Sequence, residues 1–309
     1  MAQNNGAICF LGVSLPRFLI ITHQDMKKIL LIIAAMGMLM SVLSCNNDDE
    51  PSGDGVFNVN TPMVNHIVNL NNGNVIGMSA THNRLTLDTL KHQASVELTY
   101  NDGNGDKTVK VSNLTATATR LGFYVLKGGD NSQVKDFSGY VDFNESSIRY
   151  AYTTNDGIRV ISTIADVFFL KTKNYVTYDD TTAATSMDNV MYQFTLNPAQ
   201  KTAIVKVMDI VHAKDWKRFI NITASSVPVT VATNGYVIAG ENLNTNATYI
   251  AHSDSASVSP GVKQTDKYPF QVFNAIVDLE NDSIIANYMI GSSATVVASG
   301  RTYPDYTAY

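Results

Sequence analysis

Residues 96–111 read VELTYNDGNGDKTVKV and contain two runs in which apolar and polar side chains alternate. A period of two is the spacing of a strand that buries one of its faces. The six residues between the runs are all Asn, Asp or Gly, which favour tight turns. The segment therefore predicts a hairpin of two antiparallel strands.

The same pattern recurs along the chain. Residues 140–143 (YVDF) and 148–152 (IRYAY) flank a turn at residues 144–146, and an NDG turn at residues 155–157 leads into RVI at residues 159–161. The 15 Tyr and 12 Phe of the chain also suit a pleated, half-buried surface. We expect an almost all-β protein in which short connections join antiparallel neighbours.

Weak identities divide the β part into two copies, and an internal repeat of this kind determines how the fold is read. The first copy is predicted over residues 56–165 and the second over residues 166–309. The offset between matching segments rises by 23 towards the end, which predicts an insertion in the second copy within residues 242–269. The matching segments are 65–67 with 174–176, 85–88 with 194–197, 94–98 with 203–207, 114–118 with 227–231, 122–123 with 235–236, 141–143 with 277–279 and 147–152 with 283–288.

Each copy is expected to be an antiparallel β-meander of about six or seven strands. Two packings suit the pattern: each copy closes into its own small barrel or sandwich, or both copies join one larger curved sheet. An open sheet with exposed edges is disfavoured. Residues 209–219 have spacing compatible with either a helix or a loop.

The N-terminal region has the order of a secretory signal. Residues 26–45 read MKKILLIIAAMGMLMSVLSC, with two lysines, an unbroken apolar run of 12 residues from 29 to 40, and the small residue Ser44 before Cys45. The apolar run has the length of a signal-peptide core and is shorter than the ~20 residues that span a bilayer. Residues 26–44 are therefore predicted to be a signal peptide, and residues 1–25 an over-extended start.

Residues 42–45 (VLSC) resemble a lipobox, and the acidic run NNDDE follows at residues 46–50. The signal and the acidic tether, residues 45–55, are together similar to those of exported Bacteroidetes-type lipoproteins. This resemblance implies lipidation at Cys45, attachment to the outer membrane and display at the cell surface. Some of these proteins have calycin-like or lipocalin-like barrels, but the lipocalin-type Gly-x-Trp is missing, since the only Trp is Trp216. Fold resemblance alone does not carry a lipid-binding function over.

Charge and cysteine content exclude several functions. Charged residues make up 16% of the chain, below the ~25% of ordinary soluble domains. Removal of residues 1–44 leaves 19 basic and 26 acidic residues, and no basic run is present, so nucleic acid is excluded as a partner. Cys9 and Cys45 both precede the β part, which therefore has no disulfide or catalytic thiol.

Catalytic and metal-binding patterns are missing from the sequence. Neither HExxH nor a His pair at helical spacing occurs, so the histidines are interpreted as surface or hairpin residues. Residues 102–106 begin like a calcium loop but lack the later Gly and Glu of an EF-hand, which leaves a hairpin turn. The acid pairs Asp142 with Glu145 and Asp278 with Glu280 are interpreted as solvated turn residues. We predict no enzyme activity, no metal site and no cofactor. The histidines after Cys45 are His66, His82, His92, His212 and His252.

Aromatic residues after a glycine recur in both copies, at Phe123 and Tyr236. Such residues line ligand cavities as well as ordinary cores. The predicted function is that of a non-catalytic, outer-membrane-anchored lipoprotein that binds a small apolar ligand or a glycan in or between the two copies. A structural or adhesive surface protein, similar to fimbrial accessory subunits, is the alternative. A hydrolase with dispersed acids is the least favoured reading.

Overall fold

The computed structural model describes residues 55–130, 132–178, 185–211, 218–251, 270–290 and 294–302. These residues fall within one compact unit, Val42–Tyr309. Every regular element among them is a β-strand, as the alternating sequence predicted. Across these ranges, no helix has the length and apolar character that a membrane crossing requires. Cys45, the signal peptide and Trp216 lie outside the described residues.

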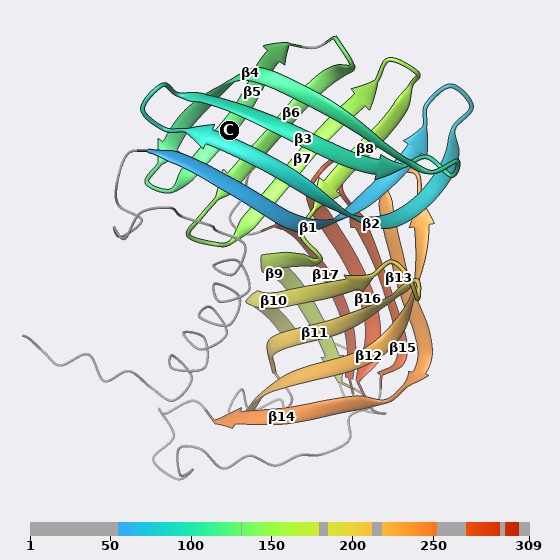
Figure 1. Cartoon of the computed structure of the whole chain (residues 1–309). Helices are drawn as coiled ribbons and strands as arrows, with labels where there is room; N and C mark the ends of the chain where they lie inside the picture. Colours follow the sequence, from blue (N-terminus) through green and yellow to red (C-terminus); the bar gives the residue numbers. More distant parts are fainter. Residues whose placement is uncertain are drawn as a thin grey trace, which may run out of the picture. The chain divides into compact units, whose positions relative to one another are not determined.

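The first eight strands form a closed antiparallel barrel (Figure 1). Each strand pairs with the next, and β8 returns to pair with β1, so the sheet has no free edge. Closure of this kind removes the unpaired backbone groups that an edge strand would expose. The strands are β1 (Val56–Asn69), β2 (Asn74–Asp88), β3 (Gln93–Asn101), β4 (Asp106–Arg120), β5 (Phe123–Asp130), β6 (Val134–Asp142), β7 (Ser147–Thr154) and β8 (Ile158–Thr163).

The second barrel is built in the same way from eight of the nine remaining strands. β17 pairs with β9, and β11 pairs with β12, which completes the ring. β14 is an additional strand that pairs with β12 outside this ring. The strands are β9 (Asp166–Tyr178), β10 (Thr185–Asn197), β11 (Thr202–Val211), β12 (Arg218–Ala232), β13 (Gly235–Leu243), β14 (Thr245–Ala251), β15 (Phe270–Asp278), β16 (Ser283–Ile290) and β17 (Ala294–Thr302).

The structure thus decides between the two packings, because each copy closes into its own barrel of eight strands. The expectation of six or seven strands per copy was too low. The helix-compatible reading of residues 209–219 is wrong where the chain is described, since residues 209–211 belong to β11 and residues 218–219 to β12. β14 falls within residues 242–269, where the offset between the copies rises.

The internal repeat is confirmed at the level of individual pairs. His66 lies opposite Ile161 in the first barrel, and Tyr175 lies opposite Val297, at the matching positions, in the second. Uncommon backbone conformations repeat as well, since non-glycine residues with positive φ occupy equivalent turn and bulge positions in both copies. These pairs are His92 (54°) with Lys201 (52°), Asn113 (55°) with Ser226 (57°) and Ser146 (50°) with Asp282 (49°).

One matched segment needs a correction. Tyr236 pairs with Val277 in the second barrel, and Val141, the equivalent of Val277, pairs with Tyr124 rather than Phe123. Tyr124 is therefore the structural counterpart of Tyr236. The shift by one residue arises at an irregularity near the end of β4, which precedes β5. Phe123 consequently points away from the core of its barrel, whereas Tyr236 belongs to the core of the second barrel.

Buried aromatic side chains fill both barrels. Tyr150 and Tyr152 belong to the core of the first barrel, and Phe194, Phe273 and Tyr288 to that of the second. Full burial of side chains of this size contributes about 1.5–3 kcal/mol each before the entropy cost of folding. The barrel interiors are packed cores, so the candidate binding surfaces lie outside them.

Candidate functional site

The turns at one end of the second barrel contact the outer wall of the first. His66 of β1 hydrogen-bonds through Nε2 to the carbonyl oxygen of Ala232 at 2.7 Å. The ring of Tyr236 meets the His66 ring edge-on, with centroids 5.6 Å apart. We call residues 232–236 and 279–282 the docking end of the second barrel. We call the side chains that meet it the docking wall of the first barrel: Val64, His66, Arg149, Ala151, Arg159 and Ile161.

Two arginines of the docking wall hold the β15–β16 turn. Arg149 pairs with Asp282 and also donates to the carbonyl oxygen of Leu279. The Arg149 and Asp282 side chains are only 13% and 9% exposed. Arg159 forms a bidentate ion pair with Glu280, with N···O distances of 3.0 and 2.8 Å. Hydrogen bonding from Arg159 lowers the pKa of the Glu280 carboxyl, so this acid is held as an anion.

The interpretation of the histidines as surface or hairpin residues is wrong for His66, which is buried. Its side chain is 1% exposed, whereas His82 and His92 are exposed as expected. Burial lowers the pKa of His66, and its Nδ1 has no hydrogen-bond partner. The signal in the sequence is the run MVNHIV at residues 63–68, which is buried on both faces and does not alternate. His212 and His252 lie outside the described residues.

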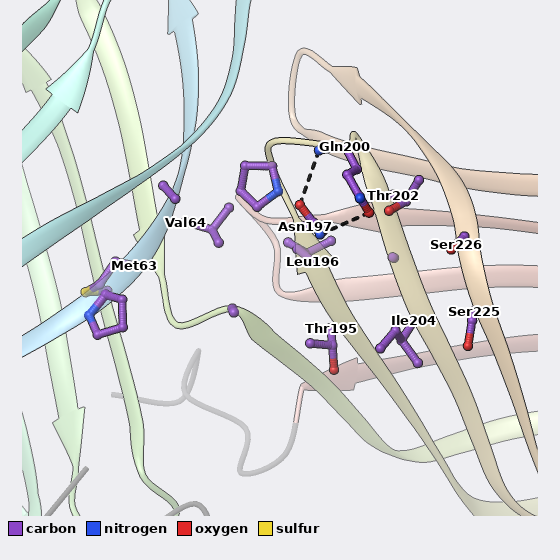
Figure 2. Close-up of a pocket in the computed structure, with 15 residues that line it drawn as sticks. Met63, Val64, Thr195, Leu196, Asn197, Gln200, Thr202, Ile204, Ser225 and Ser226 are labelled. Carbon is purple, nitrogen blue, oxygen red and sulfur yellow. Dashed lines mark hydrogen bonds between the residues drawn. The ribbon is translucent and has the colours of Figure 1, made fainter. Parts of the chain in front are cut away.

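A cleft of about 440 Å³ lies where β1 and β2 face the β10–β11 hairpin (Figure 2). Figure 2 shows Met63 and Val64 on one side and the hairpin residues Leu196 and Asn197 on the other. The cleft therefore draws its walls from both copies of the repeat. Its lining residues are Pro62, Met63, Val64, Ala80, Ala165, Thr195, Leu196, Asn197, Pro198, Gln200, Thr202, Ala203, Ile204, Ser225 and Ser226.

The lining of this cleft is amphipathic and uncharged. Hydroxyl and amide groups come from the hairpin and from β12, and aliphatic side chains come from β1, β2, β10 and β11. Asn197 and Gln200 hydrogen-bond each other across the turn at 3.2 Å, which holds the two amide groups together at the cleft edge. Among the described lining residues none is charged or aromatic, so the cleft suits an uncharged ligand.

A second hollow, of about 260 Å³, lies beside the docked β15–β16 turn. Phe123 contributes to its wall together with Tyr140, while Tyr236 lines neither hollow. The two aromatic residues singled out in the sequence are therefore not brought together. Glu280 and Asp282 also border this hollow, but both carboxylates are paired with arginines. Glu280, whose pKa is lowered, is not poised as a general acid, which would need a raised pKa.

The other acids considered in the sequence serve local structure. Asp102 pairs with Lys107 at 2.6 Å within the β3–β4 turn, in the segment that begins like a calcium loop. Asp142 is buried rather than solvated, since it is 1% exposed, accepts a backbone hydrogen bond from Asn144 at 3.1 Å and pairs with Arg120. Within the part of the chain that the structure covers, no three His, Cys, Asp or Glu side chains gather as a metal site.

Comparison with known proteins yields no family. No family model matches the chain, and no curated protein matches it. Among solved structures, the chain is similar to the crystal structure of isotype 1 transferrin-binding protein B (TbpB) from serogroup B Neisseria meningitidis. That match has 8% identity and a TM-score of 0.22, and covers 72% of this chain and 65% of the other. A likeness of this size carries no argument about function.

Proposed function

We propose that the protein is a non-catalytic, lipid-anchored binding protein of the outer membrane that holds a small uncharged ligand in the cleft between its two barrels. The observation that carries this proposal is the cleft itself. It has about 440 Å³ of space, within the ~300–1,000 Å³ typical of ligand sites, and takes its walls from both copies. The barrel interiors, by contrast, are filled by aromatic side chains.

The chemistry of the lining supports either of two uncharged ligand classes. The amides of Asn197 and Gln200 with the hydroxyls of Thr202 and Ser225 favour the hydroxyl groups of a neutral glycan. Leu196 and its aliphatic neighbours favour a small apolar molecule. The proposal excludes charged ligands from this cleft, since burying an unpaired charge against such a lining would be costly.

Anchoring is tested first. The full chain expressed in its own host should incorporate radiolabelled palmitate and fractionate with outer membranes, and Cys45→Ala should abolish both. Surface display is tested on the same cells by accessibility to an added protease. An unmodified thiol at Cys45 in the native protein would refute the anchoring part of the proposal.

Ligand binding is tested with two panels on the purified native protein. Neutral oligosaccharides on an array form the first panel, and a fluorescent uncharged apolar probe in solution forms the second. We expect one panel to give saturable binding, and we expect Ala80→Trp, which fills the cleft from β2, to remove it.

The matched control is Thr117→Trp, which places the same side chain at an exposed position of β4 away from the cleft. Binding that survives Ala80→Trp unchanged would place the ligand elsewhere. If neither panel bound, the structural or adhesive function would be the better proposal.

A further inference from the structure

Each barrel has an end and a wall of this kind, but among the described residues only the end of the second barrel and the wall of the first contact each other. The docking end of the second barrel contacts the docking wall of the first. Because the copies match pair by pair, the first barrel has an equivalent end, residues 120–124 and 143–146. The second barrel likewise has an equivalent wall. Its side chains, in the order given above for the first barrel, are Lys173, Tyr175, Ile285, Asn287, Thr295 and Val297.

The unused wall of the second barrel is unusually apolar for an exposed barrel surface. Ile285 is 54% exposed, and Tyr175 and Val297 are each 46% exposed. These side chains lie on adjacent strands, since Tyr175 and Val297 are directly paired and Ile285 is opposite exposed Ile276 on β15. Contiguous exposed apolar side chains of this kind mark interaction sites.

The unused end of the first barrel is apolar too. Leu121, in the β4–β5 turn, is 88% exposed, and Leu90 and Val56 at the same end are also exposed. Among the described large apolar residues that the first barrel exposes, only Leu70 lies at the opposite end. Exposed apolar side chains thus gather on the two surfaces that the repeat makes equivalent to a working interface.

The ion pairs of the contact within the chain are replaced by uncharged residues on both of the equivalent surfaces. Arg149 of the used wall corresponds to Ile285 of the unused wall, and its partner Asp282 corresponds to Ser146. The second ion pair, Arg159 with Glu280, is likewise replaced on both sides, by Thr295 and Asn144. No charge of these pairs is left without its partner in the equivalent arrangement, which matters because an unpaired charge in an interface is strongly unfavourable.

We propose that the protein associates head to tail with a second copy of itself, with the first-barrel end of one copy docked on the second-barrel wall of the next. This contact repeats the interface within the chain, with apolar side chains in place of the ion pairs. The two surfaces are different, so each docked copy leaves one of each free. A head-to-tail contact of this kind forms an open row unless its rotation closes a ring.

Proximity is tested by cross-linking, which the sequence makes simple. Its two cysteines, Cys9 and Cys45, both precede the barrels. Full-length chains carrying Asn144→Cys and Thr295→Cys, differently tagged, are co-expressed and treated with a short bismaleimide. By equivalence with Glu280 and Arg159, a mixed dimer should form. The control pair, Leu70→Cys with Thr295→Cys, has one exposed thiol at the opposite end of the first barrel and should give no more than background.

Specificity is tested by restoring the ion pair between copies. Ile285→Arg alone should weaken association, measured by sedimentation velocity, about tenfold or more because its charge is unpaired. Ser146→Asp supplies the acid at a position whose φ of 50° matches the 49° of Asp282. The chain that carries both Ile285→Arg and Ser146→Asp should recover association, because every contact then pairs the introduced arginine with the introduced aspartate.

Two results would overturn the proposal. The first is a native protein that sediments as a monomer across the micromolar range, with equal cross-linking of the test and control pairs. The second is loss of association in Ile285→Arg with no recovery when Ser146→Asp is added to the same chain. Binding of the first-barrel end to a lipid surface would appear as flotation of the Cys45→Ala chain with vesicles, and its loss in Leu121→Ser would assign this end to the membrane instead of a second copy.

Discussion

Arg149 shows how a single side chain fixes the contact between the barrels. It lies on β7 of the first barrel and binds both the Asp282 carboxylate and the Leu279 carbonyl of the second. Removing one partner of a buried ion pair leaves the other charge uncompensated, whereas replacing both partners by uncharged groups is much less harmful. The equivalent positions hold that uncharged alternative, Ile285 in the second copy and Ser146 in the first.

Arg149→Ile should therefore destabilise the protein by about 3 kcal/mol in urea unfolding, because buried Asp282 loses its ion pair with Arg149. The double variant Arg149→Ile with Asp282→Ser transplants the residues of the other copy and should recover most of this loss. An additive loss in the double variant would show that the two side chains do not act as a pair.

His66 predicts how stability depends on pH. Burial lowers the pKa of His66 in the folded protein below its unfolded value, which is about 6.5. As the pH falls below about 6.5, the unfolded chain takes up a proton that the folded chain does not, so the unfolding free energy declines. The contribution is fully present at higher pH.

Urea titrations between about pH 7.5 and pH 5.5 should show this decline, and His66→Phe should flatten it. His82→Gln changes an exposed histidine and should leave the slope in place. A wild-type slope retained in His66→Phe would assign the titration to another group.

At the residue scale the sequence was a partial guide. It matched Gly122-Phe123 with Gly235-Tyr236, since identity cannot reveal a one-residue irregularity in a preceding strand. It also placed His66 on the surface, because alternation describes one buried face and the outer face of β1 is buried by the second barrel. A comparison of the two copies could have indicated the contact between the barrels. At equivalent positions the first copy has Arg149 and His66 where the second has Ile285 and Tyr175.

At the scale of elements, the turns repeat more faithfully than the side chains. His92 and Lys201 adopt left-handed backbone conformations at equivalent turns. In both copies the carbonyl oxygen of this residue accepts a hydrogen bond of 2.9 Å from a strand two elements on, from Ala116 N in the first copy and Val229 N in the second. The turn therefore fixes how β3 and β11 enter their sheets.

His92→Val and Lys201→Val should each lower stability by about 1–2 kcal/mol, because a β-branched residue is strained at positive φ. His92→Gly should be tolerated, since glycine adopts this conformation without a steric cost. Gln93→Val, one residue further in an exposed strand position, serves as the control. Thermal unfolding measures all four variants, and equal effects at positions 92 and 93 would contradict a backbone origin.

Hairpins were the elements most readily predicted. Residues 96–111, 140–152 and 155–161 all form strands joined at the expected turns. The strand count was too low because long strands such as β1 and β2 contain Asn, Thr and Gly, which weaken the alternation without ending the strand. Ring closure joins β1 to β8, about a hundred residues apart, and no local pattern reports such a pairing.

At the scale of the whole molecule, the described chain consists of two copies of the same closed barrel. The duplication explains the cleft and the second hollow, because each forms where the end of the second barrel meets the wall of the first. It also explains why exposed apolar side chains collect on two surfaces. The cleft and the head-to-tail contact follow from docking of the barrels, which the sequence alone did not specify.

The most direct test is to detect, in solution, the strand pair that closes each barrel. Cross-strand nuclear Overhauser effects on the deuterated protein report this pairing. We predict contacts between the backbone amides of β1 and β8 around Asn65 and Ser162, and between β9 and β17 around Asn174 and Ala298. Contacts at both sites would show two separately closed barrels. If β1 and β8 instead paired with strands of the other copy, the two copies would share a single sheet, contradicting the fold described.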